Sequence, residues 1–147
     1  GVTDISQMTP REAADRLFDR VMRTISSGDT AGALGFQPMA VQAYIRAEPL
    51  DLDGLFHKAL LELLADPAAA LATARQILEE EPNHLLGLGV AARAALSVGD
   101  EEAATGYYEQ LLGAFEQESG RSLPEYEAHQ NLLPDYRAEA RDFLAGA

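Results

Sequence analysis

The chain has 147 residues, of which 47% are hydrophobic and 24% are charged, as in ordinary globular proteins. This length favours one domain, and the composition excludes a disordered or fibrous protein. The 24 acidic residues exceed the 11 Lys and Arg residues and give a net charge of −13, which disfavours nucleic acid and anionic membranes as partners. We therefore expect a basic or neutral partner. Because cysteine is absent, thiol catalysis, disulfides and thiolate metal sites are excluded as well.

Apolar runs are short throughout the chain. None approaches the roughly 18 residues that a membrane-spanning helix needs, and residues 1–8 lack the basic start and apolar run of a signal peptide. We expect residues 1–8 to be a linker or tail, without direct membrane contact. Abundant Ala, Leu and Arg with a single lysine, Lys58, favours a bacterial source. The expected location of the protein is the bacterial cytoplasm, or the membrane surface if a membrane tether precedes Gly1.

The first predicted helix covers Pro10 to Ser27. Thr9 can cap it, Pro10 is tolerated at its first position, and Glu12 completes a capping box with Thr9. Apolar residues then recur three and four positions apart, as on one face of a helix; they are Leu17, Phe18, Val21, Met22 and Ile25. Gly28 predicts the end of the helix, because glycine adopts the left-handed conformation without strain.

The second predicted helix begins after Asp29 or Thr30 and ends before Pro49. Pro38 is expected to break or kink it, because proline has no amide hydrogen and clashes with the preceding turn.

Six further helices are predicted after Pro49. The limits of the first four are Asp51 or Asp53 to Asp66, Pro67 to Glu81, Asn83 to Gly99, and Asp100 to Phe115. A short helix follows from Ser122 or Leu123 to Asn131, and a last one from about Pro134 to Ala145. The last helix carries an apolar stripe of Tyr136, Ala140, Phe143 and Leu144, which suits the end of a repeat array. No strand-like alternation competes, so the predicted class is all-α.

The turns between these helices repeat. Gly28-Asp29, Ala65-Asp66 and Gly99-Asp100 share a small residue followed by Asp, and two other turns contain Glu48-Pro49 and Glu81-Pro82. The two prolines lie 33 residues apart, and Asp66 and Asp100 lie 34 residues apart, against a tetratricopeptide period of about 34. The stretch from Gly99 to Leu112 resembles the second half of that motif, with Ala104 and Tyr108 at its small and aromatic positions.

The chain thus resembles the tetratricopeptide repeat proteins of bacteria. The resemblance implies a right-handed α-solenoid with units of about 9–49, 50–82 and 83–116 and a cap of 117–147. Small residues such as Ala70, Ala92 and Ala104 are expected where helices approach closely.

Tetratricopeptide arrays usually bind a peptide or partner protein on a concave face lined by the first helix of each pair. By register, this resemblance places Phe18, Met22, Leu55, Ala59, Glu62, Gly89, Arg93 and Leu96 there. The alternative for the apolar members is that they belong to the core. The Lys, Asn and Arg clamp with which some family members hold chaperone tails is not found, because its places are taken by Phe18, Met22, Leu55, Ala59, Gly89 and Val90. The expected function is a protein-binding scaffold; the alternative is a self-association domain whose homodimer buries Phe18 and Leu55, within a larger and possibly membrane-tethered protein.

No catalytic constellation is visible in the sequence. His57, His84 and His129 lie far apart in the repeat scheme and form no HxxxH or HExxH spacing, so we expect surface or capping histidines and neither a metal site nor a cofactor. A hydrolase that uses carboxylates such as Glu62 is disfavoured, because no paired acid and base are apparent. The protein is therefore not expected to be an enzyme.

Overall fold

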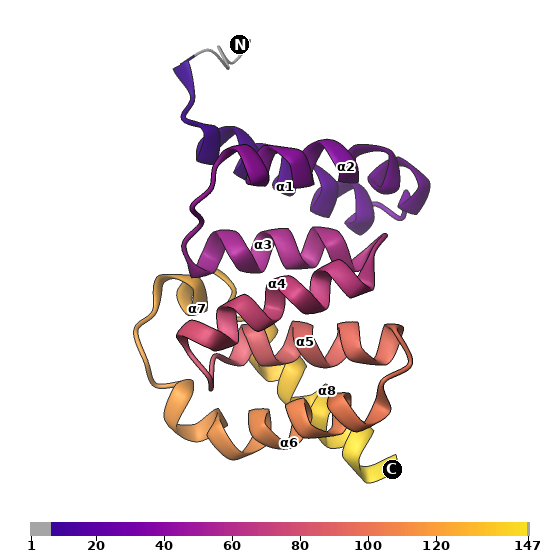
Figure 1. The fold of residues 1–147 in the computed structure, drawn as a ribbon, viewed down its shortest axis with the longest axis vertical. Coiled ribbons are helices and arrows are strands. Elements are labelled where there is room, and N and C mark those ends of the chain that lie inside the picture. The colour runs from indigo at the N-terminus through magenta and orange to yellow at the C-terminus, as the bar shows by residue number, and fades with distance from the viewer. Residues whose placement is uncertain (1–6, 147) are drawn as a thin grey trace.

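The computed structural model describes residues 7–146 and contains, over that range, eight α-helices and no strand. In chain order the helices are α1 (Pro10–Ser26), α2 (Thr30–Arg46), α3 (Leu52–Leu63), α4 (Pro67–Glu80), α5 (Leu85–Ser97), α6 (Glu101–Glu118), α7 (Pro124–Ala128) and α8 (Leu132–Gly146) (Figure 1). The predicted all-α class is confirmed. In this part of the chain, no helix is both long and apolar enough to cross a bilayer. Residues 1–6 of the expected N-terminal tail lie outside the described residues.

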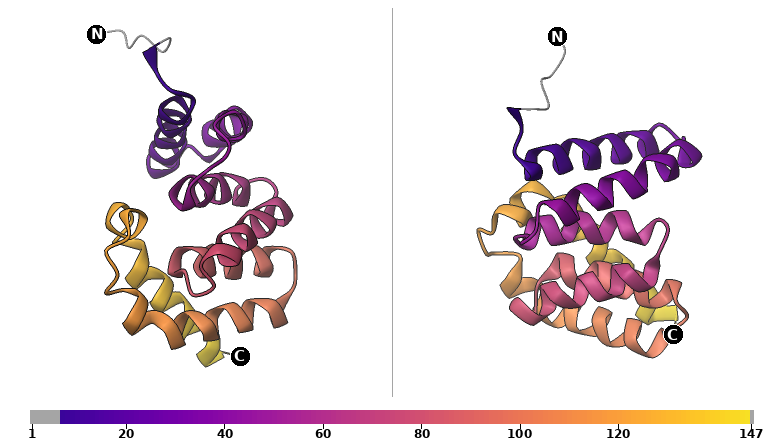
Figure 2. Two further views of the ribbon diagram at one scale, coloured as in Figure 1. Left: turned by 60° about the vertical axis from the view of Figure 1, so that its left-hand side comes forward. Right: turned by 45° about the horizontal axis from the view of Figure 1, so that its top comes forward.

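The first six helices form three hairpins. α1 packs with α2, α3 with α4, and α5 with α6. Contacts of α2 with α3 and of α4 with α5 join the hairpins, which follow one another along the long axis of the molecule (Figures 1 and 2). The first helices of the hairpins also contact one another, α1 with α3 and α3 with α5. These three helices line one side of the stack, which we call the inner face.

Left-handed glycines end α1 and α5. Gly28 has a φ of 88° and Gly99 a φ of 84°, a backbone conformation that other residues rarely adopt. Asp29 and Asp100 follow directly and cap α2 and α6, each accepting a hydrogen bond from the amide three residues on, at 2.8 and 3.0 Å. The Gly-Asp turns predicted from the sequence are confirmed.

α2 continues through Pro38 as one helix, so of the two expected effects, a break or a kink, the break does not occur. Pro38 is exposed, and its missing amide hydrogen removes one backbone hydrogen bond. Ala33, Ala40 and Tyr44 of the same helix are almost completely buried in a cluster with residues of α1 and α3. This packing outweighs the lost bond, because tertiary contacts supply most of the stability of helices in proteins.

Several helix limits also differ from the prediction. α3 ends at Leu63 instead of near Asp66, α7 ends at Ala128 instead of Asn131, and α8 begins at Leu132 instead of about Pro134. His84, and not Asn83, caps α5, because its Nδ1 accepts a hydrogen bond from the amide three residues on, at 3.2 Å. A capping role, one of those expected for the histidines, is thereby confirmed for His84. α6 extends past Phe115 to Glu118, since neither proline nor glycine interrupts residues 116–119.

Two clusters of buried apolar side chains hold the helices together. The smaller cluster joins α1 to α2 and reaches Leu61 of α3, and the larger one spans α3 to α8. Ala70, Ala92 and Ala104 are fully buried, in keeping with the prediction that small residues stand where helices approach closely.

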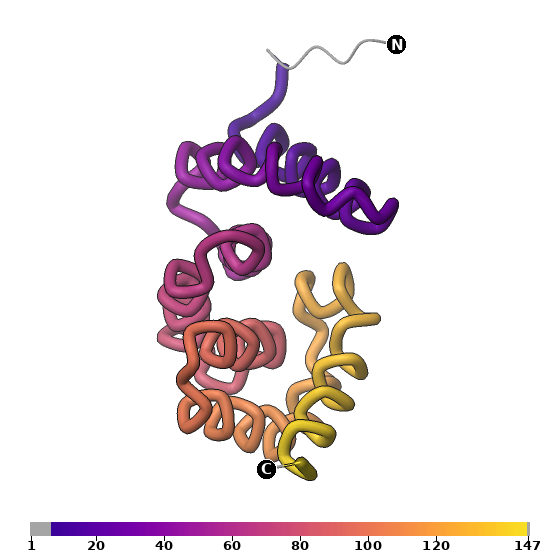
Figure 3. Tube along the Cα trace, turned by 90° about the vertical axis from the view of Figure 1, so that its right-hand side faces the viewer, coloured from indigo at the N-terminus to yellow at the C-terminus, as the bar shows by residue number. Residues whose placement is uncertain are grey.

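The segment after α6 turns back toward the inner face. α8 packs against α6 and α5, and α7 reaches α3. In Figure 3 the helices α1 to α6 trace a curve whose open side is partly closed by α7 and α8. Tyr136 and Ala140 of the predicted apolar stripe are fully buried there. The C-terminal helix therefore covers part of the inner face and does not extend the stack as another hairpin.

Candidate functional site

The residues predicted to contact a partner lie on α1, α3 and α5, and most are buried. The buried ones are Phe18, Leu55, Ala59, Glu62 and Gly89, while Met22, Arg93 and Leu96 are partly exposed. In this conformation the buried residues serve packing, which is the alternative that the register left open. Contact of a partner with these positions stays a prediction.

The inner face at α5 is occupied by α8 of the same chain. A Cβ atom at Gly89 would overlap the ring of Tyr136, so the glycine lets α8 approach the α5 backbone. Arg93 donates hydrogen bonds to both carboxylate oxygens of Glu139 at 2.8 to 3.0 Å, and its guanidinium lies 4.9 Å from the centre of the Tyr136 ring. Tyr108 donates to the same carboxylate at 2.9 Å. Two of the predicted partner-binding residues therefore contact the chain's own C-terminal helix.

Glu62 links the two helices of the second hairpin. Its carboxylate accepts a hydrogen bond of 2.5 Å from the Thr73 hydroxyl of α4 and lies 3.7 Å from the Lys58 ammonium. Buried polar groups are stable only when they are paired, and this pairing ties α3 to α4. In this structure Glu62 therefore serves to hold the second hairpin together.

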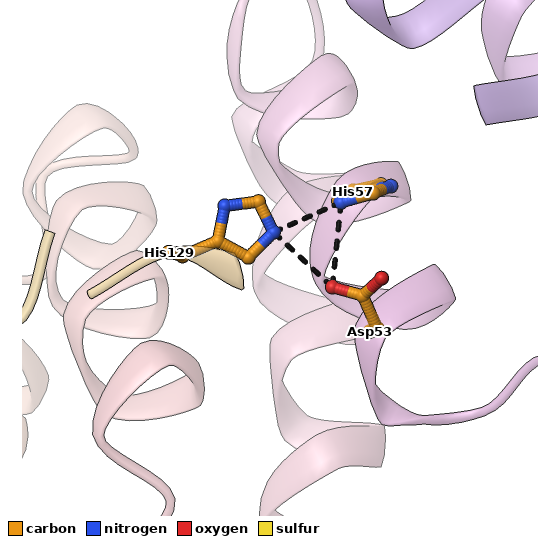
Figure 4. Close-up of side chains that lie close together, drawn as sticks. All are labelled: Asp53, His57 and His129. Atoms are coloured by element: carbon orange, nitrogen blue, oxygen red, sulfur yellow. Dashed lines mark hydrogen bonds and ion pairs between the residues drawn. The ribbon is translucent and has the colours of Figure 1, made fainter. Parts of the chain in front are cut away.

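A cluster of two histidines and an aspartate lies between α3 and the segment after α7 (Figure 4). Asp53 and His57 are four residues apart and share one face of α3, and His129 directly follows α7. The His57 Nε2 and His129 Nε2 atoms are 2.9 Å apart, and the Asp53 Oδ1 atom lies 3.1 Å from the His129 nitrogen and 3.3 Å from the His57 nitrogen. We call these three residues the histidine cluster. The expectation that His57 and His129 lie far apart is wrong.

The other side of the His57 ring is held by α1 and α2. Tyr44 donates its hydroxyl hydrogen to Asp15 at 2.5 Å, and the Tyr44 oxygen lies 2.8 Å from His57 Nδ1. Because the Tyr44 hydrogen is already engaged, its oxygen accepts from an Nδ1–H group, and Asp15 Oδ1 at 3.2 Å is a second acceptor. Phe18 stacks on the ring at 4.0 Å between centroids. These contacts favour the tautomer whose Nε2 lone pair faces His129 and Asp53.

His129 is positioned by two contacts between α7 and the start of α5. His84 Nε2 and Glu125 Oε1 are 2.8 Å apart, and both side chains are buried. The Tyr126 hydroxyl accepts a hydrogen bond of 2.9 Å from the Leu85 amide. A helix as short as α7 has little stability of its own, so these contacts hold it in place and bring His129 to α3.

Burial and neighbouring charges set the ionisation of the cluster. Burial lowers the pKa of His57, and the charge of His129 lowers it further, against the opposing effect of the nearby aspartates. Burial alone would raise the pKa of Asp53, but the hydrogen bond from His129 and the charges of His57, His129 and Arg11 hold that pKa below its ordinary value. The direction of the two pKa shifts favours the uncharged form of His57 and the charged form of Asp53.

Local spacing in the sequence brings together two of the three residues of this cluster. Asp53 and His57 are four residues apart, a spacing that places two side chains on one helix face. The HxxxH and HExxH patterns both require two histidines, so neither pattern detects an aspartate paired with a histidine. His129 lies 72 residues after His57, and no local pattern connects residues so far apart.

The most exposed large apolar side chains of the described residues lie mainly on α2. Leu34, Met39 and Ile45 are 43%, 55% and 40% exposed, and Val98 at the end of α5 is 43% exposed. A groove between the start of α1 and the end of α2 is lined mostly by apolar atoms; its residues are Met8, Thr9, Pro10, Ala13, Leu17, Met39, Ala43 and Arg46.

No protein-family model and no curated protein sequence matches the chain. Its function is therefore inferred from the residues and their geometry.

Proposed function

We propose that the chain is a right-handed α-solenoid of three tetratricopeptide-like hairpins that binds another protein or a peptide and catalyses no reaction. The repeat spacings of 33 and 34 residues, the small-then-Asp turns and the three hairpins stacked in chain order support this proposal. Stacked repeats of this kind present extended surfaces to their partners.

The observation that carries the proposal is the exposed apolar surface of the first hairpin. α8 covers part of the inner face, whereas Met39 borders the groove between α1 and α2 and is 55% exposed. Exposed apolar patches mark sites of protein interaction. We therefore place the main contact at this groove, which could accept the apolar side chains of a peptide or helix, and leave Met22, Arg93 and Leu96 as the inner-face positions still within reach of a partner.

The net charge of −13 favours a basic or neutral partner. A basic partner is drawn to the acidic surface before it makes apolar contact, so its association rate falls with salt, as the Debye length shrinks from about 30 Å at 0.01 M to about 8 Å at 0.15 M.

A pull-down from the source organism tests this function. Met39→Glu places a charge in the groove, and Val98→Glu places the same charge on another exposed apolar side chain, at the far end of α5. Loss of the partner with Met39→Glu and its retention with Val98→Glu is the expected result. Retention of the partner by both variants would remove the groove from the proposal, and recovery of nucleic acid as the main specific partner would refute the charge argument.

Self-association is the second candidate, and it is favoured by Leu34 and Ile45. These exposed residues are eleven positions apart, close to three helical turns, and so lie on the same side of α2. Phe18 and Leu55, which the sequence suggested for a dimer, are buried within the chain itself. Light scattering separates the candidates: a dimer that becomes monomeric with Leu34→Glu supports self-association, and a monomer at all concentrations excludes it.

A further inference from the structure

We propose that Asp53, His57 and His129 form a binding site for one divalent transition metal ion of the zinc class. The proposal does not depend on partner binding, because it rests on the histidine cluster and not on α2. Two imidazole nitrogens and one carboxylate oxygen are ligands that zinc and its neighbours accept, whereas magnesium and calcium prefer oxygen alone.

The distances within the cluster fit one ion. Its three ligand atoms are 2.9, 3.1 and 3.3 Å apart, and ligands about 2.0 to 2.1 Å from an ion are about 2.9 Å apart at right angles and about 3.3 Å apart at tetrahedral angles. The circle through the three atoms has a radius of about 1.8 Å, so a point about 1 Å off their plane reaches all three at the bond length of roughly 2.05 Å. In Figure 4 the two rings and the carboxylate point toward one another.

The ligand atoms of His57 and Asp53 are free to bind an ion, while hydrogen bonds at other atoms hold the same two side chains in place. The His57 Nε2 lone pair faces the cluster because Nδ1 donates toward Tyr44 and Asp15. Asp53 uses Oδ2 for Arg11, at 3.0 Å, and keeps Oδ1 for the cluster. Outer partners of this kind, especially a carboxylate behind a histidine, orient the ligands of zinc sites.

The contact between the two histidines supports the same assignment. Two imidazole nitrogens 2.9 Å apart form a hydrogen bond only when one of them carries a hydrogen. Since His57 Nε2 is the bare nitrogen, the single Nε2–H of His129 faces two acceptors, His57 and Asp53. An ion that takes the place of this hydrogen, with the His129 proton moved to Nδ1, gives all three ligand atoms a partner at once.

An ion at this site would join α3 to the C-terminal segment. α7 makes few contacts with α3, and the ion would add bonds between residues that are 72 positions apart. Three protein ligands leave at least one coordination position open, for water or for a ligand from solution. The ligand side chains are only 10% (His57), 16% (His129) and 24% (Asp53) exposed, so access to this position is narrow.

Titration calorimetry with zinc tests the site on the full chain, produced without a histidine tag and freed of metal by a chelator. We expect one zinc ion per chain. His129→Ala and Asp53→Ala each remove a ligand and should weaken binding at least about 100-fold, the upper end of the loss caused by removing an outer partner. Gln130→Ala, next to His129 and exposed, is the matched control and should bind as tightly as the unchanged chain. Circular dichroism verifies that each variant is folded.

Two measurements on the unchanged chain keep the proposal testable if a variant does not fold. X-ray absorption of the zinc complex should show two imidazole nitrogens among the nearest ligands. Zinc should also slow amide hydrogen exchange in residues 121–131 about tenfold or more, because the ion fixes the segment before α8. Equal zinc affinity of His129→Ala, Asp53→Ala and the unchanged chain, or a first shell of oxygen alone, would overturn the proposal and assign the binding to the acidic surface.

Discussion

Replacing Gly89 by Ala should weaken the packing of α8 on the inner face. The new Cβ atom would overlap the buried ring of Tyr136, and overpacking of this kind costs about 1 to 3 kcal/mol. Alanine in the middle of a helix returns about 0.5 to 1 kcal/mol relative to glycine. The expected net loss in the free energy of unfolding is therefore between about 0 and 2.5 kcal/mol, with the middle of the range near 1 kcal/mol. Its ceiling is about 3 to 5 kcal/mol, the cost of losing a buried aromatic ring altogether.

Urea unfolding followed by circular dichroism measures this loss, and amide exchange locates it in residues 132–146. Gly106→Ala is the matched control, because Gly106 also lies in a helix but a Cβ atom added there would meet nothing within 4 Å beyond the backbone of its own helix; it should gain about 0.5 to 1 kcal/mol. Adding Tyr136→Ala to Gly89→Ala should cost less than the two separate losses combined, since the clash disappears with the ring. Equal stability of Gly89→Ala and Gly106→Ala would refute the close approach of α8 to α5.

Three further predictions concern single side chains. The Tyr136 hydroxyl is buried without a hydrogen-bond partner among residues 7–146, so Tyr136→Phe should keep or raise the free energy of unfolding measured in urea. Tyr108→Phe loses a hydrogen bond to a carboxylate and should lower that free energy by about 1.5 to 3 kcal/mol. A larger loss with Tyr136→Phe than with Tyr108→Phe would contradict this prediction. Pro38→Ala restores a donor in the middle of α2 and should raise the free energy of unfolding by about 2 kcal/mol, while a loss would show that the proline is needed there. The hydrogen bond from Arg121 lowers the pKa of Glu81 below its ordinary value. The difference in urea midpoint between the unchanged chain and Arg121→Ala should therefore be constant above about pH 5 and shrink as the pH falls through the lowered pKa. A midpoint difference that does not change down to pH 2 would exclude this ion pair.

Local chemistry in the sequence determined the helices and their turns. The Thr9 capping box forms with both of its hydrogen bonds, and Gly28 and Gly99 adopt the left-handed conformation before Asp29 and Asp100. Such features depend on residues three or four positions apart, which the chain brings together whatever the rest of the fold does. The apolar spacing likewise predicted the buried face of α1, where Phe18 and Val21 are buried, but on α2 it included Leu34, which is exposed.

Predictions from local sequence were wrong where contacts between distant parts of the chain outweighed local preferences. Pro38 does not break α2, because the buried face of that helix is held by α1 and α3. Gly89 and Arg93 were predicted for the binding face by their register, but register does not reveal that α8 returns to cover Gly89 and to form an ion pair with Arg93. The path of the chain after residue 118 is set by contacts such as those of Tyr136 and Glu139, which local patterns do not encode.

Only the tertiary structure decided the histidine cluster. Asp53 and His57 share a helix face by their spacing alone, but His129 reaches them because α7 is fixed against α5 by Glu125 and Tyr126. The positions of these ligands depend on three helices packed from distant parts of the chain, so no stretch of sequence contains the site. Spacing along the chain therefore determined the elements, and the return of the C-terminal segment onto the inner face determined which of their side chains meet.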